Sequence, residues 1–177
     1  MKIFTIKISL CLILILSLFN ACKKPVSYPD TPSIKYESFE IIDSIDALDE
    51  EMKYGILLFS FIDGDGDIGL NSDDTVAPFD TSSIYYNNLF ITMMEFKNDS
   101  LKEVKLTTPL NFRIRPRFES SGQNKTLKGK IKVKLEYNNI FLSKYDTIKY
   151  YFYILDRDHH QSNTAESNTI ILPDPSN

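Results

Sequence analysis

The chain has 177 residues with 20 basic and 24 acidic side chains, a formal net charge of −4, and two cysteines. An acidic balance argues against a nucleic-acid-binding protein. Because Cys11 and Cys22 both lie near the N-terminus, the rest of the chain has no thiol for a disulfide, a metal site or a nucleophile.

Residues 1–21 have the features of a secretory signal peptide. Lys2 and Lys7 form a basic start, an apolar run of about 11 residues follows, and Ala21 precedes Cys22. The apolar run is shorter than the roughly 20 residues that a spanning helix needs. We therefore expect a cleaved signal rather than a transmembrane anchor.

Residues 18–22 resemble the lipobox of bacterial lipoproteins. The resemblance implies that Cys22 receives a diacylglycerol, that the chain is cut before it, and that the new amine is acylated, so that palmitate or similar chains are expected there. Lys23 stands where an aspartate would favour the inner membrane, which implies an outer-membrane anchor held by several buried acyl chains. The alternative is ordinary secretion with an incidental cysteine.

Residues 22–33 follow as a lipidated, extended tether. The segment contains Pro25, Pro29 and Pro32 and has no apolar periodicity. We expect one folded domain over residues 34–177.

This domain is predicted to be all-β, because short runs rich in Ile, Val, Phe, Tyr and Thr are separated by turn-forming residues. The expected strands cover residues 34–43, 53–62, 88–97, 101–107, 110–118, 127–137, 146–156 and 167–173. Residues 54–62 and 148–155 are apolar on both faces, which predicts central strands. Only residues 43–52 show a helical period.

This pattern predicts a two-sheet antiparallel β-sandwich, with an immunoglobulin or fibronectin type III-like Greek key as the first choice and a small barrel as the alternative. The absence of tryptophan and of paired cysteines removes the antibody-type signature.

The most distinctive segment is an acidic loop at residues 61–74. Alternating aspartates turn several carboxylates into one loop, and the intervening glycines permit the positive φ angles that such a loop requires. Between residues 54 and 96 there are seven acidic residues and no Lys or Arg, so nothing local neutralises them. Hard oxygen ligands at this spacing suit calcium in a structural role.

Residues 63–68 resemble the middle of EF-hand calcium loops, but in that register the first ligand position falls on Phe61, which cannot coordinate. A strand-to-strand loop is therefore the expected form. The candidate metal ligands are Asp63, Asp65, Asp67, Asn71, Asp73 and Asp74. The alternative is that the Asp-Gly pairs form solvated turns without an ion.

A basic stretch follows the acidic loop. Residues 97–150 contain 13 basic and 5 acidic residues. Two alternating sets with a short connection are expected to share one face of a hairpin and to form a patch for an anionic ligand. The residues of this patch are Arg113, Arg115, Arg117, Lys128, Lys130, Lys132 and Lys134. The expected partner is an anionic glycan, lipopolysaccharide or another envelope protein; the alternative is a solvated face.

No catalytic motif is recognisable, and we expect no enzyme. His159 and His160 lie among aspartates, but adjacent side chains on an extended chain point in opposite directions. A hydrolase remains the weakest alternative. A glycan-binding protein of a nutrient-uptake system is the second interpretation, with a stacking platform of tyrosines that are more often packing residues. These tyrosines are Tyr85, Tyr86, Tyr150, Tyr151 and Tyr153.

Residues 61–70 and 151–172 together resemble an uncharacterised group of Bacteroidota lipoproteins. The second segment, with Asp156, Arg157 and two Ser-Asn pairs, also resembles the last two strands of bacterial immunoglobulin-like modules. The resemblance implies a sandwich fold in the cell envelope and no known activity. The combined expectation is an outer-membrane lipoprotein that acts as a non-enzymatic binding or assembly module.

Overall fold

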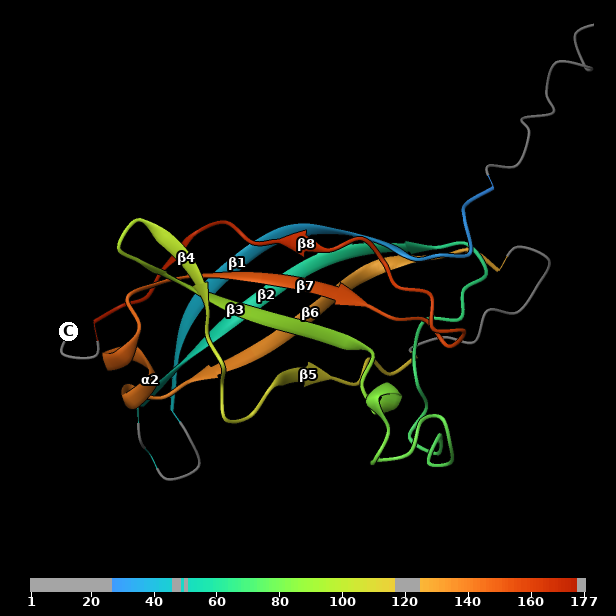
Figure 1. Ribbon diagram of the computed structural model, residues 1–177, viewed down its shortest axis with the longest axis horizontal. Helices are drawn as coiled ribbons and strands as arrows, with labels where there is room; N and C mark the ends of the chain where they lie inside the picture. Colours follow the sequence, from blue (N-terminus) through green and yellow to red (C-terminus); the bar gives the residue numbers. More distant parts are fainter. Residues whose placement is uncertain (1–26, 46–48, 50, 117–124, 175–177) are drawn as a thin grey trace, which may run out of the picture.

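The computed structural model describes residues 27–45, 49, 51–116 and 125–174, which form two packed antiparallel β-sheets (Figure 1). The predicted all-β sandwich is therefore confirmed. The signal peptide, Cys22 and Arg117 lie outside the described residues. The strands are β1 (Ser33–Ile45), β2 (Glu51–Asp63), β3 (Leu89–Lys97), β4 (Ser100–Glu103), β5 (Leu110–Phe112), β6 (Leu127–Tyr137), β7 (Thr147–Ile154), β8 (Ala165–Glu166) and β9 (Ile170–Ile171).

The first sheet has the order β1-β2-β6. β2 is central, as its apolar character on both faces predicts, and it pairs over nearly its whole length with both neighbours. On β6, Val133 and Leu135 point into the core while the alternating lysines Lys130, Lys132 and Lys134 are exposed, so the alternation predicted from the sequence is confirmed.

The second sheet has the order β4-β3-β7-β8, with β5 also on β3 and β9 also on β7. β7 is central, as predicted. If the strands are lettered as in sandwich domains, A, B and E (β1, β2 and β6) face C′, C, F and G (β4 with β5, β3, β7, and β8 with β9). This is the Greek-key order of fibronectin type III domains.

The core lies between the two sheets. Phe59 of β2 and Phe152 of β7 are both fully buried, and their ring centroids are 5.1 Å apart. The hydroxyls of Tyr137 and Tyr150, one from each sheet, share a hydrogen bond of 2.7 Å in the interior. This bond satisfies two polar groups that would otherwise be costly to bury.

One edge of the sandwich is closed by a side chain. The amide of Asn163 accepts a hydrogen bond from the backbone N–H of Ile34 and donates one to its carbonyl, each at 2.9 Å. Asn163 therefore imitates a strand partner for β1 and joins the first sheet to the end of the second.

The structure corrects several expected boundaries. β5 ends at Phe112 rather than at residue 118, because the N–H of Ile114 bonds to the side chain of Asn88 and the carbonyl of Ile114 accepts from Leu70. The last expected strand, over residues 167–173, is reduced to β9 (Ile170–Ile171), and β8 (Ala165–Glu166) precedes it. Residues 43–45 and 51–52, where a helical period was read, belong to β1 and β2.

The short helices were not predicted. They are a 3₁₀ turn, η2 (Ile84–Tyr86), and α2 (Asn139–Lys144), whose N-terminus is capped by Asn138. No helix in the described part of the chain is long and apolar enough to cross a lipid bilayer.

Candidate functional site

The acidic loop begins where β2 ends. Asp63 is the last residue of β2 and is fully buried, and the chain re-enters the core at Ile68 and Leu70, which are 4% and 1% exposed. Between these anchors the backbone makes a tight curve, with Gly66 at a φ of 72°. The glycine conformation expected from the sequence is confirmed at this position.

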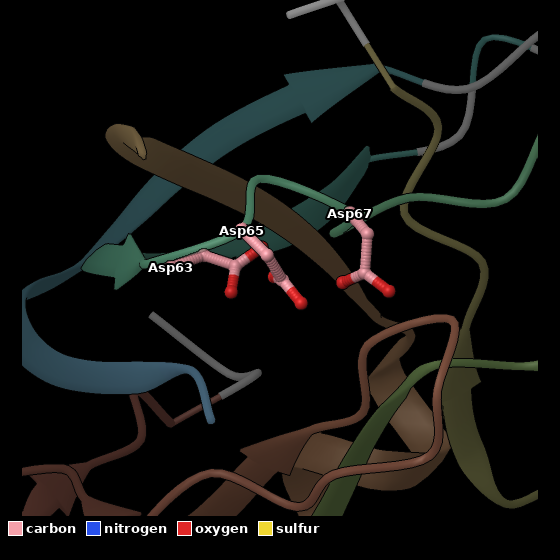
Figure 2. A group of neighbouring side chains, drawn as sticks. All are labelled: Asp63, Asp65 and Asp67. Atoms are coloured by element: carbon pink, nitrogen blue, oxygen red, sulfur yellow. The ribbon is translucent and has the colours of Figure 1, made fainter. Parts of the chain in front are cut away.

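The curve gathers three carboxylates. Oxygen atoms of Asp63, Asp65 and Asp67 lie within 4.8 Å of one another. Figure 2 shows the three side chains on the same side of the loop backbone. Two oxygens that coordinate one calcium ion from opposite sides lie about 5 Å apart, so this spacing fits a shared cation.

The hydrogen bonds leave part of this cluster unsatisfied. One oxygen of Asp63, Oδ2, accepts a hydrogen bond from the N–H of Ile68 at 3.0 Å. The Oδ1 atoms of Asp63, Asp65 and Asp67 are buried and have no hydrogen-bond partner. None of the three carboxylates forms a salt bridge with a described Lys, Arg or His. Buried polar atoms in proteins are nearly always paired, so these three oxygens are exceptions that require a physical explanation.

The pKa values of two of these aspartates are raised, as expected for buried carboxylates that lie close together. Burial, with a smaller contribution from the charges of Asp65 and Asp67, raises the pKa of Asp63 to about 7, against its hydrogen bond from Ile68. Burial also raises the pKa of Asp67 to about 6, with the charges of Asp156 and Asp65 adding to the effect. The protein therefore disfavours full ionisation of this cluster unless a cation is present.

A second loop, which follows β7, faces the cluster. The N–H of Asp158 donates to the carboxylate of Asp67, and Asp156 is 2% exposed. The carboxylate of Asp156 accepts a hydrogen bond from the backbone N–H of His160 at 2.7 Å. It also lies 2.9 Å from Nδ1 of the His160 ring and pairs with this atom. This pairing raises the pKa of the His160 imidazole through the hydrogen bond and charge of Asp156.

The other candidate ligands lie elsewhere in the structure. Asp74 forms two hydrogen bonds with the guanidinium of Arg157, at 2.6 and 3.0 Å, and these bonds hold the pKa of Asp74 below its usual value. Asp73 is exposed, and Asn71 uses its backbone N–H to bond Asp74. Among the described residues, the carboxylates close enough together to hold a metal ion are those of Asp63, Asp65 and Asp67.

Arg113 has a structural task in the long loop between β2 and β3. Its guanidinium donates to the backbone carbonyls of Asn71, Asp74 and Tyr86, at 3.0, 2.8 and 2.6 Å. Most of its donors are therefore occupied by the protein itself, and it holds the loop against the strand end of β5.

The predicted basic patch is arranged differently from the expected hairpin. β5 pairs with β3 in the second sheet and β6 pairs with β2 in the first, so the arginines and lysines belong to different sheets. The two segments nevertheless line opposite walls of one groove. Arg115 and the four lysines are exposed: Lys128, Lys130, Lys132 and Lys134.

The tyrosines do not form one exposed strip. Tyr150 is fully buried in the core, and Tyr153 stacks on Phe90 at 5.1 Å. Tyr85 stacks on His159 at 3.9 Å, which holds this histidine, with its φ of 67°, on the side of η2. His159 and His160 thus have separate environments: the ring of His160 bonds to the Asp156 carboxylate, whereas His159 bonds to the Asp156 carbonyl through its backbone N–H.

Sequence reasoning missed Asp156 and Asp158 as neighbours of the acidic loop. They are about 90 residues away from Asp67 along the chain. The signal was available in the topology, since in the expected Greek key the strands preceding both segments end at the same end of the sandwich.

Comparisons with protein-family models, with curated proteins and with solved structures gave no match to this chain.

Proposed function

We propose that this protein is a lipid-anchored binding or assembly module of the outer membrane, without enzymatic activity, whose acidic loop is stabilised by calcium. The observation that carries the calcium site is the cluster of three buried, unpartnered carboxylate oxygens on Asp63, Asp65 and Asp67. An acidic cluster alone is common on protein surfaces. Here Asp63 is fully buried and one of its oxygens is directed into the cluster.

The donor set favours calcium over other biological cations. Carboxylate oxygens suit hard cations, whereas zinc prefers histidine and cysteine. Magnesium requires near-ideal octahedral geometry, while calcium accepts the irregular sets that a curved loop and its carbonyls supply. A bound ion would neutralise the repulsion among the aspartates and hold the loop that directly follows β2. Its role would be structural.

The lipid anchor rests on the sequence before residue 27. A basic start, a short apolar run and the lipobox-like residues 18–22 support acylation of Cys22. The binding role is supported by the exposed basic side chains of Arg115 and of four lysines of β6, which line one groove. The glycan-binding alternative has less support, since Tyr150 is in the core.

Calcium titration of the full-length protein in detergent tests the site. Extracellular calcium modules bind at roughly 0.1–1 mM, so about 1 mM calcium is expected to add about 0.4–1.4 kcal/mol of stability. For a domain of this size, that gain is about 1–5 °C in melting temperature. Melting curves in calcium and in a chelator measure it.

Two matched variants locate the ligands. Asp65→Asn is expected to remove the calcium-dependent shift, because it takes away a charge from the cluster. Asp73→Asn, an exposed aspartate of the same loop outside the cluster, is expected to keep it. Equal shifts in the two variants, or identical wild-type curves with and without calcium, would overturn the calcium site.

A further inference from the structure

The free edge of β6 lies beside an open groove. β6 is the last strand of its sheet and pairs only with β2 among the described residues. Residues 127–134 of β6 line one side of the groove, and the other side is lined by residues 112–116, which are the last residue of β5 and the segment after it. The groove has a volume of about 640 Å³, within the range of ligand-binding cavities. In the part of the chain that the structure describes, the sandwich is therefore open on the β6 side and closed by Asn163 on the β1 side.

The floor of this groove is the hydrophobic core. Phe61, Ile68 and Leu89 line it, and all three are at most 9% exposed. Ile131 and Val133 of β6 also point inward, toward the same space. An added strand could place its inward side chains on this floor and remove apolar surface from water.

The charged residues that line the groove are all basic. Six of the residues that line the groove are basic, and none is acidic. On β6 the lysines lie on the outer face, where Lys130 bonds Glu37 at 3.3 Å and Lys134 lies 3.2 Å from the ring centroid of Tyr54. An additional strand beside β6 would set its outward side chains directly against this column of lysines.

These observations specify the occupant. We propose that the free edge of β6 takes up an extended segment of another protein in which apolar residues alternate with acidic residues. Side chains alternate between the two faces of a sheet, so the apolar set would enter the groove while the acidic set would face the lysines. Strand addition of this kind supplies affinity through the main chain and specificity through alternate side chains. The inference deepens the proposed function by naming the partner of the binding module.

A second copy of the chain fits this edge poorly. Pairing β6 with β6 of another molecule would bring two columns of lysines together, and facing like charges are destabilising. The same lysines discourage uncontrolled pairing of an exposed strand edge. Selectivity for an acidic strand and protection against self-association therefore follow from one set of residues.

A designed octapeptide of alternating valine and glutamate, labelled with fluorescein, is the probe. Fluorescence anisotropy with the full-length protein in detergent and calcium is expected to show saturable binding that weakens as salt is raised. The matching valine-lysine octapeptide is expected to show none. Binding of both peptides, or of neither, would overturn the proposal.

Charge-reversed protein variants test the basic residues of the groove. Arg115→Glu with Lys132→Glu places one reversal on each side of the groove, and both side chains are exposed. Binding of the acidic peptide is expected to weaken at least tenfold, and binding of the basic peptide to appear. Lys102→Glu, on β4 of the other sheet, is the matched control and is expected to bind as the wild type does. An unchanged affinity in the double variant would contradict the model of charge recognition.

Backbone methylation separates strand addition from simple attraction between charges. Alternate amides of a strand point to the same edge, so peptides methylated on all valine amides or on all glutamate amides should differ, with one of them inactive. Strand addition would be overturned if the two methylated peptides bound equally well. It would also be overturned if a sulfated polysaccharide competed with the peptide while methylation had no effect, or if the free protein formed a dimer. Identical melting curves with and without calcium, together with intact peptide binding, would identify failure of the calcium site alone.

Discussion

Arg157 and Asp74 form a doubly hydrogen-bonded ion pair, with N–O distances of 2.6 and 3.0 Å, that joins the turn after β7 to the long loop between β2 and β3. Arg157 also donates to the carbonyl of Gly69 at 3.3 Å. Arg157 directly follows Asp156, and its partners Asp74 and Gly69 belong to the loop that carries Asp67. These contacts therefore hold the turn after β7 against the acidic loop.

Loss of this ion pair is expected to loosen the loop. Asp74→Asn and Arg157→Met should each lower the free energy of unfolding by about 1 kcal/mol, since the pair is partly exposed but bidentate. The double variant should cost less than the sum of the single variants. Urea denaturation of the four proteins measures the coupling, and strictly additive losses would contradict it.

The ion-free protein is expected to lose stability as the pH rises. The raised pKa values of Asp63, about 7, and Asp67, about 6, mean that the folded state holds protons which the unfolded chain has released above its pKa of 3.8. In a chelator, the free energy of unfolding should therefore fall between about pH 4 and pH 7, by up to roughly 1.4 kcal/mol per pH unit for one such group.

Asp63→Asn serves as the control for this pH dependence, because the amide does not titrate. Its urea unfolding series should be flatter than that of the wild type over the same interval. A wild-type stability that rises from pH 4 to pH 7 in chelator would contradict the assignment.

Replacement of Gly66 by alanine is expected to lower the stability of the protein more than replacement by asparagine. Its φ of 72° lies in the left-handed region, where a Cβ costs about 1–2 kcal/mol and asparagine is tolerated better. Thermal unfolding should rank the proteins as wild type, Gly66→Asn and Gly66→Ala in order of decreasing stability. Equal melting temperatures for the two variants would show that the backbone conformation is not the cause.

The buried tyrosine pair is expected to behave as one unit. Burial raises the pKa of Tyr137 and Tyr150 far above the ordinary range, so both hydroxyls stay neutral and share their bond. Tyr137→Phe or Tyr150→Phe leaves one hydroxyl unpaired in the core and should cost about 1–3 kcal/mol. The double variant should cost no more than either single change, as chemical denaturation can show.

Acylation at Cys22 is expected in bacterial cells that process lipoproteins. Radiolabelled palmitate should enter the wild-type protein but not Cys22→Ser, because the thiol is the site of attachment. Labelling is read after gel separation of the precipitated protein, and equal labelling of both forms would remove the anchor from the proposed function.

The local sequence pattern alone predicted the fold class and the close approach of the three central aspartates of the acidic loop. Residues 127–137 alternate apolar and lysine side chains, and β6 has those bounds. Asp63, Asp65 and Asp67 are so close in sequence that a turn with Gly66 in the left-handed region brings their carboxylates together. Interactions of this short range depend on backbone geometry that neighbouring residues determine.

Long-range pairing was decided only by the tertiary structure. Asp74, which was predicted to bind the metal, forms an ion pair with Arg157. Arg113, which was predicted to bind an anionic ligand, donates hydrogen bonds to backbone carbonyls of the long loop. The groove beside β6 exists because β5 pairs with β3 instead of with β6. Periodicity tells which face of a strand is apolar but not which strand lies next to it, since the energy of a pairing depends on contacts between residues far apart in the chain.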